Sequence, residues 1–74
     1  MTRIVRPAPR LHVGAFVRVE NEYVGDYFGV VVASTHREAT VRVDQHEGQV
    51  QADLTITAET SRVRHAPRAS WPAI

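Results

Sequence analysis

The chain of 74 residues contains no cysteine, so neither a disulfide nor a thiolate metal site can supplement its core. It is also too short for two domains, which excludes an enzyme built around an interdomain cleft. Leucine and methionine are scarce, with two Leu and one Met against twelve Val and three Ile. Because β-branched side chains lose rotamer freedom in helices and pack well on sheets, this composition predicts an all-β domain.

Lysine is absent as well, so all nine basic residues are arginines, and with eight acidic residues the net charge is +1. This balance excludes the strongly basic profile of a dedicated DNA-binding domain. Residues 1–10 and 62–74 each hold three arginines and no acid, while residues 11–61 hold three arginines and all eight carboxylates. The sequence therefore has an acidic body between two basic ends. A GC-rich genome, or a preference for forked donors to phosphate and carboxylate, would each explain the arginine usage.

Long hydrophobic runs are missing too. The longest apolar stretch covers residues 27–33, far short of the roughly 20 residues that a membrane span requires. The charged N-terminus continues into Pro-Ala-Pro-Arg at residues 7–10 rather than into an apolar segment, so we expect no signal peptide. These features predict a soluble, cytoplasmic protein that does not bind membranes.

Short segments of alternating polarity, separated by turn signals, predict five antiparallel strands. They lie at residues 15–20, 29–33, 39–44, 49–54 and 62–65. Residues 45–48 should close a hairpin with Gly48 at positive φ, and residues 55–61 should form a short 3₁₀ turn. Five short strands with a long first connection are typical of a small SH3-like barrel.

The two ends of the chain are predicted to be flexible tails. Residues 1–10 are basic and contain two prolines, and residues 66–74 contain two prolines and Trp71. Because proline lacks a backbone N–H, neither segment is suited to an interior strand. The barrel is therefore assigned to residues 11–65.

The inward phase of the predicted strands gives the expected core. Its members are Val17, Val19, Val31, Val41, Val43, Val50 and Leu54. Phe16 should cover one end of the barrel, and Phe28 should join the core. Truncation of Val43 or Val50 to alanine is predicted to cost about 1–3 kcal/mol.

One stretch of the chain resembles a known family. Its residues are Val13-Gly14, Val17-Arg18-Val19, Gly29-Val30-Val31 and Val41-Arg42-Val43. They resemble the KOW motif of SH3-like domains in ribosomal proteins and in transcription elongation factors similar to NusG. The resemblance covers residues 13–44 and implies an SH3-like barrel, in which Gly29 would let the chain turn sharply into the second strand. The same pattern resembles the SH3-fold accessory subunits of photosystem I and of ferredoxin-thioredoxin reductase, which are docking proteins without catalytic chemistry.

Residues that could carry chemistry form no catalytic or metal-binding pattern. The histidines, at positions 12, 36, 46 and 65, are too widely spaced for a compact pair of metal ligands. The acidic residues of the loop at 20–26 lack the spacing of an EF-hand, and no serine has the context of a catalytic nucleophile. We therefore expect no enzymatic activity, no metal and no cofactor.

The loop after the first strand is one candidate binding site. Three of the five aromatic residues of the chain, Tyr23, Tyr27 and Phe28, lie within six positions there. Aromatic side chains offer a large contact area at low entropy cost, and acidic neighbours repel phosphate. The predicted surface for a protein partner carrying Arg or Lys consists of Glu20, Glu22, Tyr23, Asp26 and Tyr27.

The basic tails are a second candidate, because the first and last strands of SH3-like barrels lie close together. The residues that could converge are Arg3, Arg6, Arg10, Arg62, Arg64 and Arg68, with Trp71 beside them. Such a patch could bind the backbone of RNA or DNA, with Trp71 stacked on a base, or an acidic protein surface. Alternatively, the tails only keep the protein soluble.

These observations predict a non-enzymatic accessory or regulatory module, of a kind that a phage could encode. It would bind a component of the transcription or translation machinery and take no small-molecule substrate. The partner would be a larger protein or a ribonucleoprotein complex, with nucleic acid contacted through the arginine tails. The alternative is an SH3-fold docking subunit of an electron-transfer complex.

Overall fold

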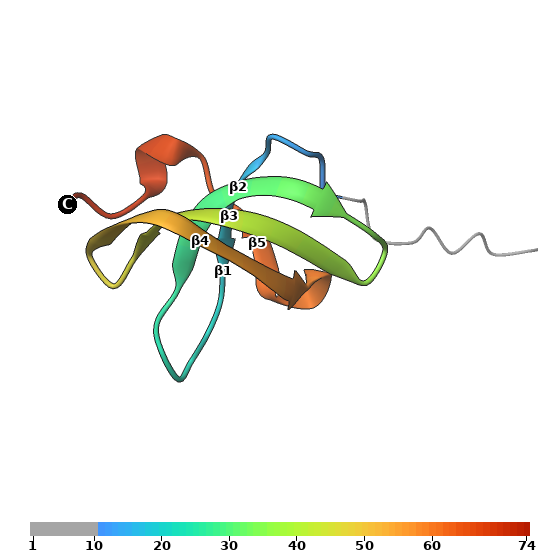
Figure 1. Ribbon diagram of the computed structural model, residues 1–74, viewed down its shortest axis with the longest axis horizontal. Helices are drawn as coiled ribbons and strands as arrows, with labels where there is room; N and C mark the ends of the chain where they lie inside the picture. The colour runs from blue at the N-terminus through green and yellow to red at the C-terminus, as the bar shows by residue number, and fades with distance from the viewer. Residues whose placement is uncertain (1–10) are drawn as a thin grey trace, which may run out of the picture.

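Five antiparallel strands form one curved sheet in the order β4-β3-β2-β1-β5 (Figure 1). A computed structural model describes residues 11–74. Its elements are β1 (Phe16–Val19), β2 (Tyr27–Ser34), β3 (Glu38–His46), β4 (Gln49–Glu59), the 3₁₀ turn η1 (Thr60–Arg62), β5 (Val63–His65) and the 3₁₀ turn η2 (Arg68–Ser70). The predicted all-β class is confirmed. Neither 3₁₀ turn of the described chain is long or apolar enough to cross a membrane.

The first and last strands are neighbours, as expected, with Arg18 opposite Arg64 in the β1–β5 pair. Among residues 11–74, the other edge of the sheet is β4, which pairs there with β3 alone. Because β4 and β5 do not pair with each other, backbone hydrogen bonds do not close the sheet into a barrel. The domain therefore keeps two sheet edges.

The core is a layer of valine side chains from the three central strands. Val17, Val31, Val41 and Val43 are each at most 1% exposed. Val19, at 3%, belongs to the same cluster, so these five predicted core positions are confirmed. Their alternation along β1, β2 and β3 places every second side chain on the inner face of the sheet.

The prediction for Val50 is wrong, because its side chain is 71% exposed. The cause lies in the register of β3 and β4, where Val43 faces Leu54 but Gln45 faces Val50. This irregularity places three residues of β4, at 51–53, against Asp44 alone, and such bulges bend a strand away from its regular path. Leu54 is half-buried and packs against the core.

β4 runs five residues beyond its predicted end and replaces most of the 3₁₀ turn predicted for residues 55–61. Ile56 and Ala58 continue the inward phase that begins at Leu54, and both pack against the core. The β-branched residues at 55–57 favour an extended backbone, and cross-strand packing against β3 completes the strand. In this part of the chain the 3₁₀ geometry is limited to η1, at Thr60–Arg62.

Residues 66–71 belong to the folded body, which corrects the prediction of a flexible tail. Trp71 is 9% exposed, and its indole Nε1–H donates a 2.8 Å hydrogen bond to the carbonyl oxygen of Ala66, which is itself buried. Gln45 Nε2 donates to the carbonyl oxygen of Pro72 at 3.0 Å. A buried indole with its N–H satisfied holds the segment against the sheet.

Trp71 also explains where the two phenylalanines lie. Phe16 meets the indole edge to face, with ring centroids 5.7 Å apart. Phe28 is tilted against it at 6.0 Å. Phe28 is half-buried and lies outside the valine cluster, so it forms a small second cluster with Trp71 instead of joining the core.

Gly29 is needed for a different reason from the predicted sharp turn. It lies inside β2, and it is not among the positive-φ glycines of residues 11–74. A Cβ atom at this position would overlap the carbonyl oxygen of Arg42 and lie 2.9 Å from Val41 Cγ1. Gly29 therefore permits the close approach of β2 and β3.

Val43→Ala should lower the free energy of unfolding by about 1–3 kcal/mol, because it removes buried methyl groups and leaves a cavity. Val50→Ala is the matched control and should change it by less than about 0.5 kcal/mol, since that side chain is exposed. Urea unfolding followed by circular dichroism measures both. Equal losses for the two variants would contradict the observed register.

Gly29→Ala should lower the free energy of unfolding by about 2 kcal/mol or more, because the added methyl group overlaps the backbone of β3. Gly48→Asn serves as the control, since Gly48 has a φ of 75° with open space around it. Asparagine tolerates that conformation, so the control should lose no more than about 1 kcal/mol. An alanine variant as stable as the wild type would rule out the close approach.

Candidate protein-binding loop

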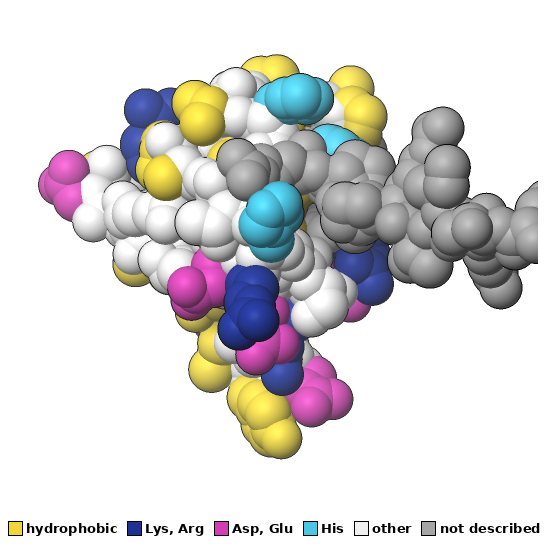
Figure 2. Space-filling view, turned by 90° about the vertical axis from the view of Figure 1, so that its right-hand side faces the viewer, with side chains coloured by type: hydrophobic (Ala, Val, Ile, Leu, Met, Phe, Trp, Pro, Cys, Tyr) yellow, Lys and Arg dark blue, Asp and Glu magenta, His cyan; other side chains and the backbone are white. Residues whose placement is uncertain are grey.

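The β1–β2 loop, residues 20–26, projects from the sheet as a narrow finger (Figure 1). In the space-filling view, hydrophobic side chains form the tip of the molecule and acidic side chains flank it (Figure 2). Tyr23 is 84% exposed and Val24 is 43% exposed. The exposed tyrosine expected in this loop is therefore Tyr23.

Asn21 organises the backbone of the loop. Its side-chain Oδ1 accepts hydrogen bonds from the N–H groups of Tyr23 at 2.9 Å and Val24 at 3.2 Å. Its carbonyl oxygen accepts a third bond, from the N–H of Gly25 at 3.1 Å. Gly25 then adopts a φ of 85°, which glycine reaches without steric cost. This Asx turn presents the two apolar side chains in a defined geometry.

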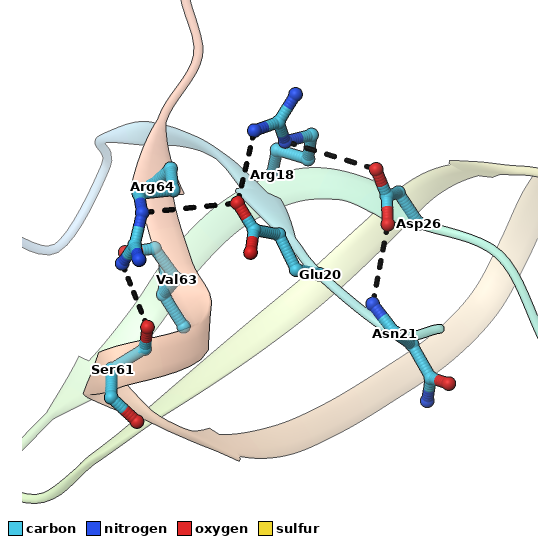
Figure 3. A network of polar contacts seen from close by, with 7 residues as sticks. All are labelled: Arg18, Glu20, Asn21, Asp26, Ser61, Val63 and Arg64. Carbon is cyan, nitrogen blue, oxygen red and sulfur yellow. Dashed lines mark hydrogen bonds and ion pairs between the residues drawn. The ribbon is translucent and has the colours of Figure 1, made fainter. Parts of the chain in front are cut away.

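A network of ion pairs supports the base of the loop (Figure 3). Arg18 Nη2 lies 3.0 Å from Glu20 Oε1, and Arg18 Nε lies 3.8 Å from Asp26 Oδ2. Arg64 Nε approaches the same Glu20 oxygen at 3.8 Å. Asp26 Oδ1 also accepts a hydrogen bond from the N–H of Asn21 at 3.2 Å. Each exposed pair contributes little alone, but together they join both ends of the loop to β1 and β5.

The predicted acidic residues therefore divide into two groups. Glu20 and Asp26 neutralise arginines of the same chain, whereas Glu22 is exposed on the projecting part of the loop. The residues that the projecting part of the loop exposes are Glu22, Tyr23 and Val24. Val24 is the member that sequence reasoning did not select.

Tyr27 has a structural position instead of a place in this surface. Its ring stacks on His46 with centroids 3.9 Å apart and planes inclined by 7°. His46 Nδ1 lies 3.2 Å from the carbonyl oxygen of Asp26. The β3–β4 hairpin thus braces the second half of the loop. Asn21 and Gly25 are residue types that favour a turn, so the turn could be expected from the sequence. The stacking of Tyr27 on His46 could not, because the two residues are far apart in the chain.

The basic residues predicted to converge are only partly within the described chain. Arg3, Arg6 and Arg10 lie outside it. Arg64 pairs with Glu20 and donates to the carbonyl oxygen of Ser61 at 2.7 Å. Arg68 places its guanidinium 5.5 Å from the centre of the Trp71 ring. Arg62 is exposed and lines a hollow together with Glu20 and Glu22.

Trp71 is buried against the phenylalanines, so its ring is not presented as an open platform for a base. Within residues 11–74, no group of three histidine or acidic side chains is arranged to hold a metal ion. The projecting loop therefore offers exposed apolar surface, from Tyr23 and Val24, next to the carboxylate of Glu22.

Comparison of the chain with protein-family models finds no match. Searches of curated proteins and of solved structures find no significant match either. The resemblance to KOW domains over residues 13–44 therefore stays a prediction.

Asn21→Ala should loosen the loop without unfolding the domain, because the N–H groups of Tyr23 and Val24 lose their acceptor. We expect amide hydrogen exchange at these two residues to accelerate at least about 10-fold, and the free energy of unfolding to fall by about 0.5–1.5 kcal/mol. Asn21→Asp keeps the acceptor oxygen and is the control. Unchanged exchange in the alanine variant would contradict the role assigned to this side chain.

Proposed function

We propose that the protein is a non-enzymatic docking module that binds a larger protein through the tip of its β1–β2 loop. The observation that carries the proposal is Tyr23, 84% exposed on a loop whose backbone is fixed by hydrogen bonds. An exposed aromatic side chain on a pre-organised loop loses little entropy on binding, which makes it an effective anchor.

The charges of the loop favour a protein partner over nucleic acid. Glu22 lies next to the anchor, and Glu20 and Asp26 lie at the base of the loop. Because Glu20 and Asp26 are paired with Arg18 and Arg64, it is the exposed carboxylate of Glu22 that would repel a phosphate backbone and attract an Arg or Lys side chain on a protein surface. The complementary site is an apolar pocket bordered by basic residues.

The resemblance to KOW domains supports a partner in the transcription or translation machinery. A module of this kind would serve as an accessory or regulatory subunit of the transcription or translation machinery, attached to a larger protein or ribonucleoprotein complex. The contribution of the arginines to nucleic-acid contact is a separable part of this hypothesis, because it makes a different prediction for salt dependence.

The combined variant Tyr23→Ala, Val24→Ser should weaken docking at least about 30-fold, the loss typical of removing an aromatic hot spot. Affinity capture from the native host, followed by mass spectrometry, identifies the partner, and titration with the purified partner measures the affinity. Val13→Ser is the matched control, because Val13 is 68% exposed but lies outside the β1–β2 loop. If both variants bind like the wild type, the loop is not the docking site.

Docking through the apolar tip should depend only weakly on salt. If the arginines instead contact nucleic acid, log affinity should fall with log salt by about 0.7–0.9 for each phosphate contact. Deletion of residues 1–10, which removes three arginines, separates the two cases. A steep salt slope that flattens on this deletion would move the main contact from the loop to the arginines.

A further inference from the structure

The outer edge of β4 is a second surface of the described chain. β4 has eleven residues, and within the part of the chain that the structure describes it pairs only with β3. Exposed edges of sheets are normally protected by proline, lysine, bulges or covering segments, because unpaired backbone groups recruit other strands. Residues 54–59, Leu-Thr-Ile-Thr-Ala-Glu, contain neither proline nor lysine and pair with β3 in regular register. This half of β4 is therefore an open template.

Register shows which backbone groups point outward. Val31 exchanges hydrogen bonds with the β1 side of β2, through the N–H of Gly14 and the carbonyl oxygen of Ala15. Because backbone groups alternate between the two sides of a strand, Val30 bonds to β3 and Val31 does not. In β3, Arg42 therefore bonds to β2, and its neighbour Val41 bonds to β4. Because Val41 faces Ile56, the backbone groups of Ile56 bond to β3. The N–H and C=O groups of Thr55 and Thr57 must then point away from the sheet.

A groove lies beside this edge and has room for side chains. It measures about 400 Å³ and lies between β4 and the base of the β1–β2 loop. Val19, Tyr27, Ile56 and Ala58 form its apolar part, and its charged lining residues are Glu20, Glu59 and Arg62. A strand added to β4 would place every second side chain in this groove, on the same face as Ile56 and Ala58.

The two faces of β4 differ in the side chains that they would accept. On the inner face, Leu54, Ile56 and Ala58 are apolar. At the alternate positions, Asp53 and Glu59 are exposed, Glu59 also lines the groove, and residues 49–59 contain no basic residue at all. An added strand would therefore match β4 best with apolar residues inward and Arg or Lys outward, since opposite charges on facing residues stabilise a strand pair.

A second copy of this chain is a poorer match than such a segment. Pairing of β4 with another β4 would bring four carboxylates to one seam without a compensating cation from either strand. Like charges that face each other across a strand pair are destabilising. The other edge of the sheet, β5, has only three residues to offer.

From these observations we infer that β4 binds an extended peptide segment of alternating basic and apolar residues, which adds to the sheet as an antiparallel sixth strand. Thr55 and Thr57 exchange backbone hydrogen bonds with the segment, its apolar side chains enter the groove beside Ile56 and Ala58, and its basic side chains face Asp53 and Glu59. This site is separate from the tip of the β1–β2 loop and stands independently of it.

The probe is a synthetic peptide, acetyl-Thr-Arg-Val-Arg-Val-Arg-Thr-amide, added to the full chain. Amide hydrogen exchange at Thr55 and Thr57 should be fast in the free protein and slow at least about 10-fold with saturating peptide, while Ile56 is protected throughout. A peptide with glutamate in place of arginine should bind at least about 10-fold more weakly.

Two methylated peptides separate strand addition from simple charge attraction. In an antiparallel pair, the residues opposite Thr55 and Thr57 use their own N–H groups, and these are the arginines on the outer face. N-methylation of the arginine amides should abolish binding, whereas N-methylation of the valine amides should leave it within about 3-fold. Both peptides have the same charge and nearly the same hydrophobicity.

Thr57→Pro tests the protein side of the contact. The N–H that it removes points outward, so proline is tolerated there without loss of a bond to β3. The variant should lose peptide binding at least about 10-fold, and Thr57→Ala should bind like the wild type. If the proline variant does not fold, the methylated peptides decide with the wild-type chain.

Three results would overturn the inference. Unchanged exchange at Thr55 and Thr57 with saturating peptide would place the peptide elsewhere. Equal binding of the two methylated peptides would reduce the contact to charge attraction. Protection of these amides in the free protein that grows with protein concentration, together with a dimer mass in sedimentation, would show that a second copy covers the edge.

Discussion

The close approach of β2 and β3 at Gly29 is the constraint on which the rest of the structure depends. Because Gly29 has no side chain, the backbone of β2 can lie against the carbonyl group of Arg42 in β3. The valine side chains of β2 and β3 can then pack into one cluster. A domain of this size buries little surface, so a small core must be packed tightly to be stable. Next to this contact the register of β2 and β3 shifts, because Gly29 faces Val43 while Phe28 faces Gln45. This shift accommodates Asp44 as an extra residue of β3 and places His46 opposite Tyr27, on which it stacks.

The alternation of apolar and polar residues along the sequence predicted which side chains of β1, β2 and β3 are buried. The five core valines of β1, β2 and β3 follow a period of two, and their burial could be predicted from the sequence. The irregular pairing near Asp44 has no such signal, because it depends on how many residues two separate strands contribute to the same length of ladder. Val50 was misplaced for that reason. Trp71 was missed for a related one, since a single aromatic residue between prolines has no periodicity and finds its partners only in three dimensions.

The sequence indicated which residues form the acidic, aromatic loop, but not which of them pair within the chain and which stay exposed. Clustered aromatic and acidic residues made this loop a candidate, because each of these residue types can be recognised in the sequence by itself. Their roles depend on partners that are distant in sequence: Arg64 neutralises Glu20, and His46 holds Tyr27 in place. Charge counting treats every carboxylate as available, whereas the folded chain uses two of them to brace the loop and leaves Glu22 exposed beside Tyr23.

The small core also determines where binding surfaces can form. In a domain with so thin a core, little interior volume is left for a ligand, so a loop and a sheet edge are the surfaces for which we propose partners. Closing the sheet between β4 and β5 would satisfy the outward groups of Thr55 and Thr57, but it would remove both the groove and the edge beside it. The base of the β1–β2 loop forms one wall of that groove through Glu20 and Tyr27. The ion pairs at Glu20 therefore lie between the loop tip and the groove, so the two surfaces that we propose for binding share one set of supporting contacts.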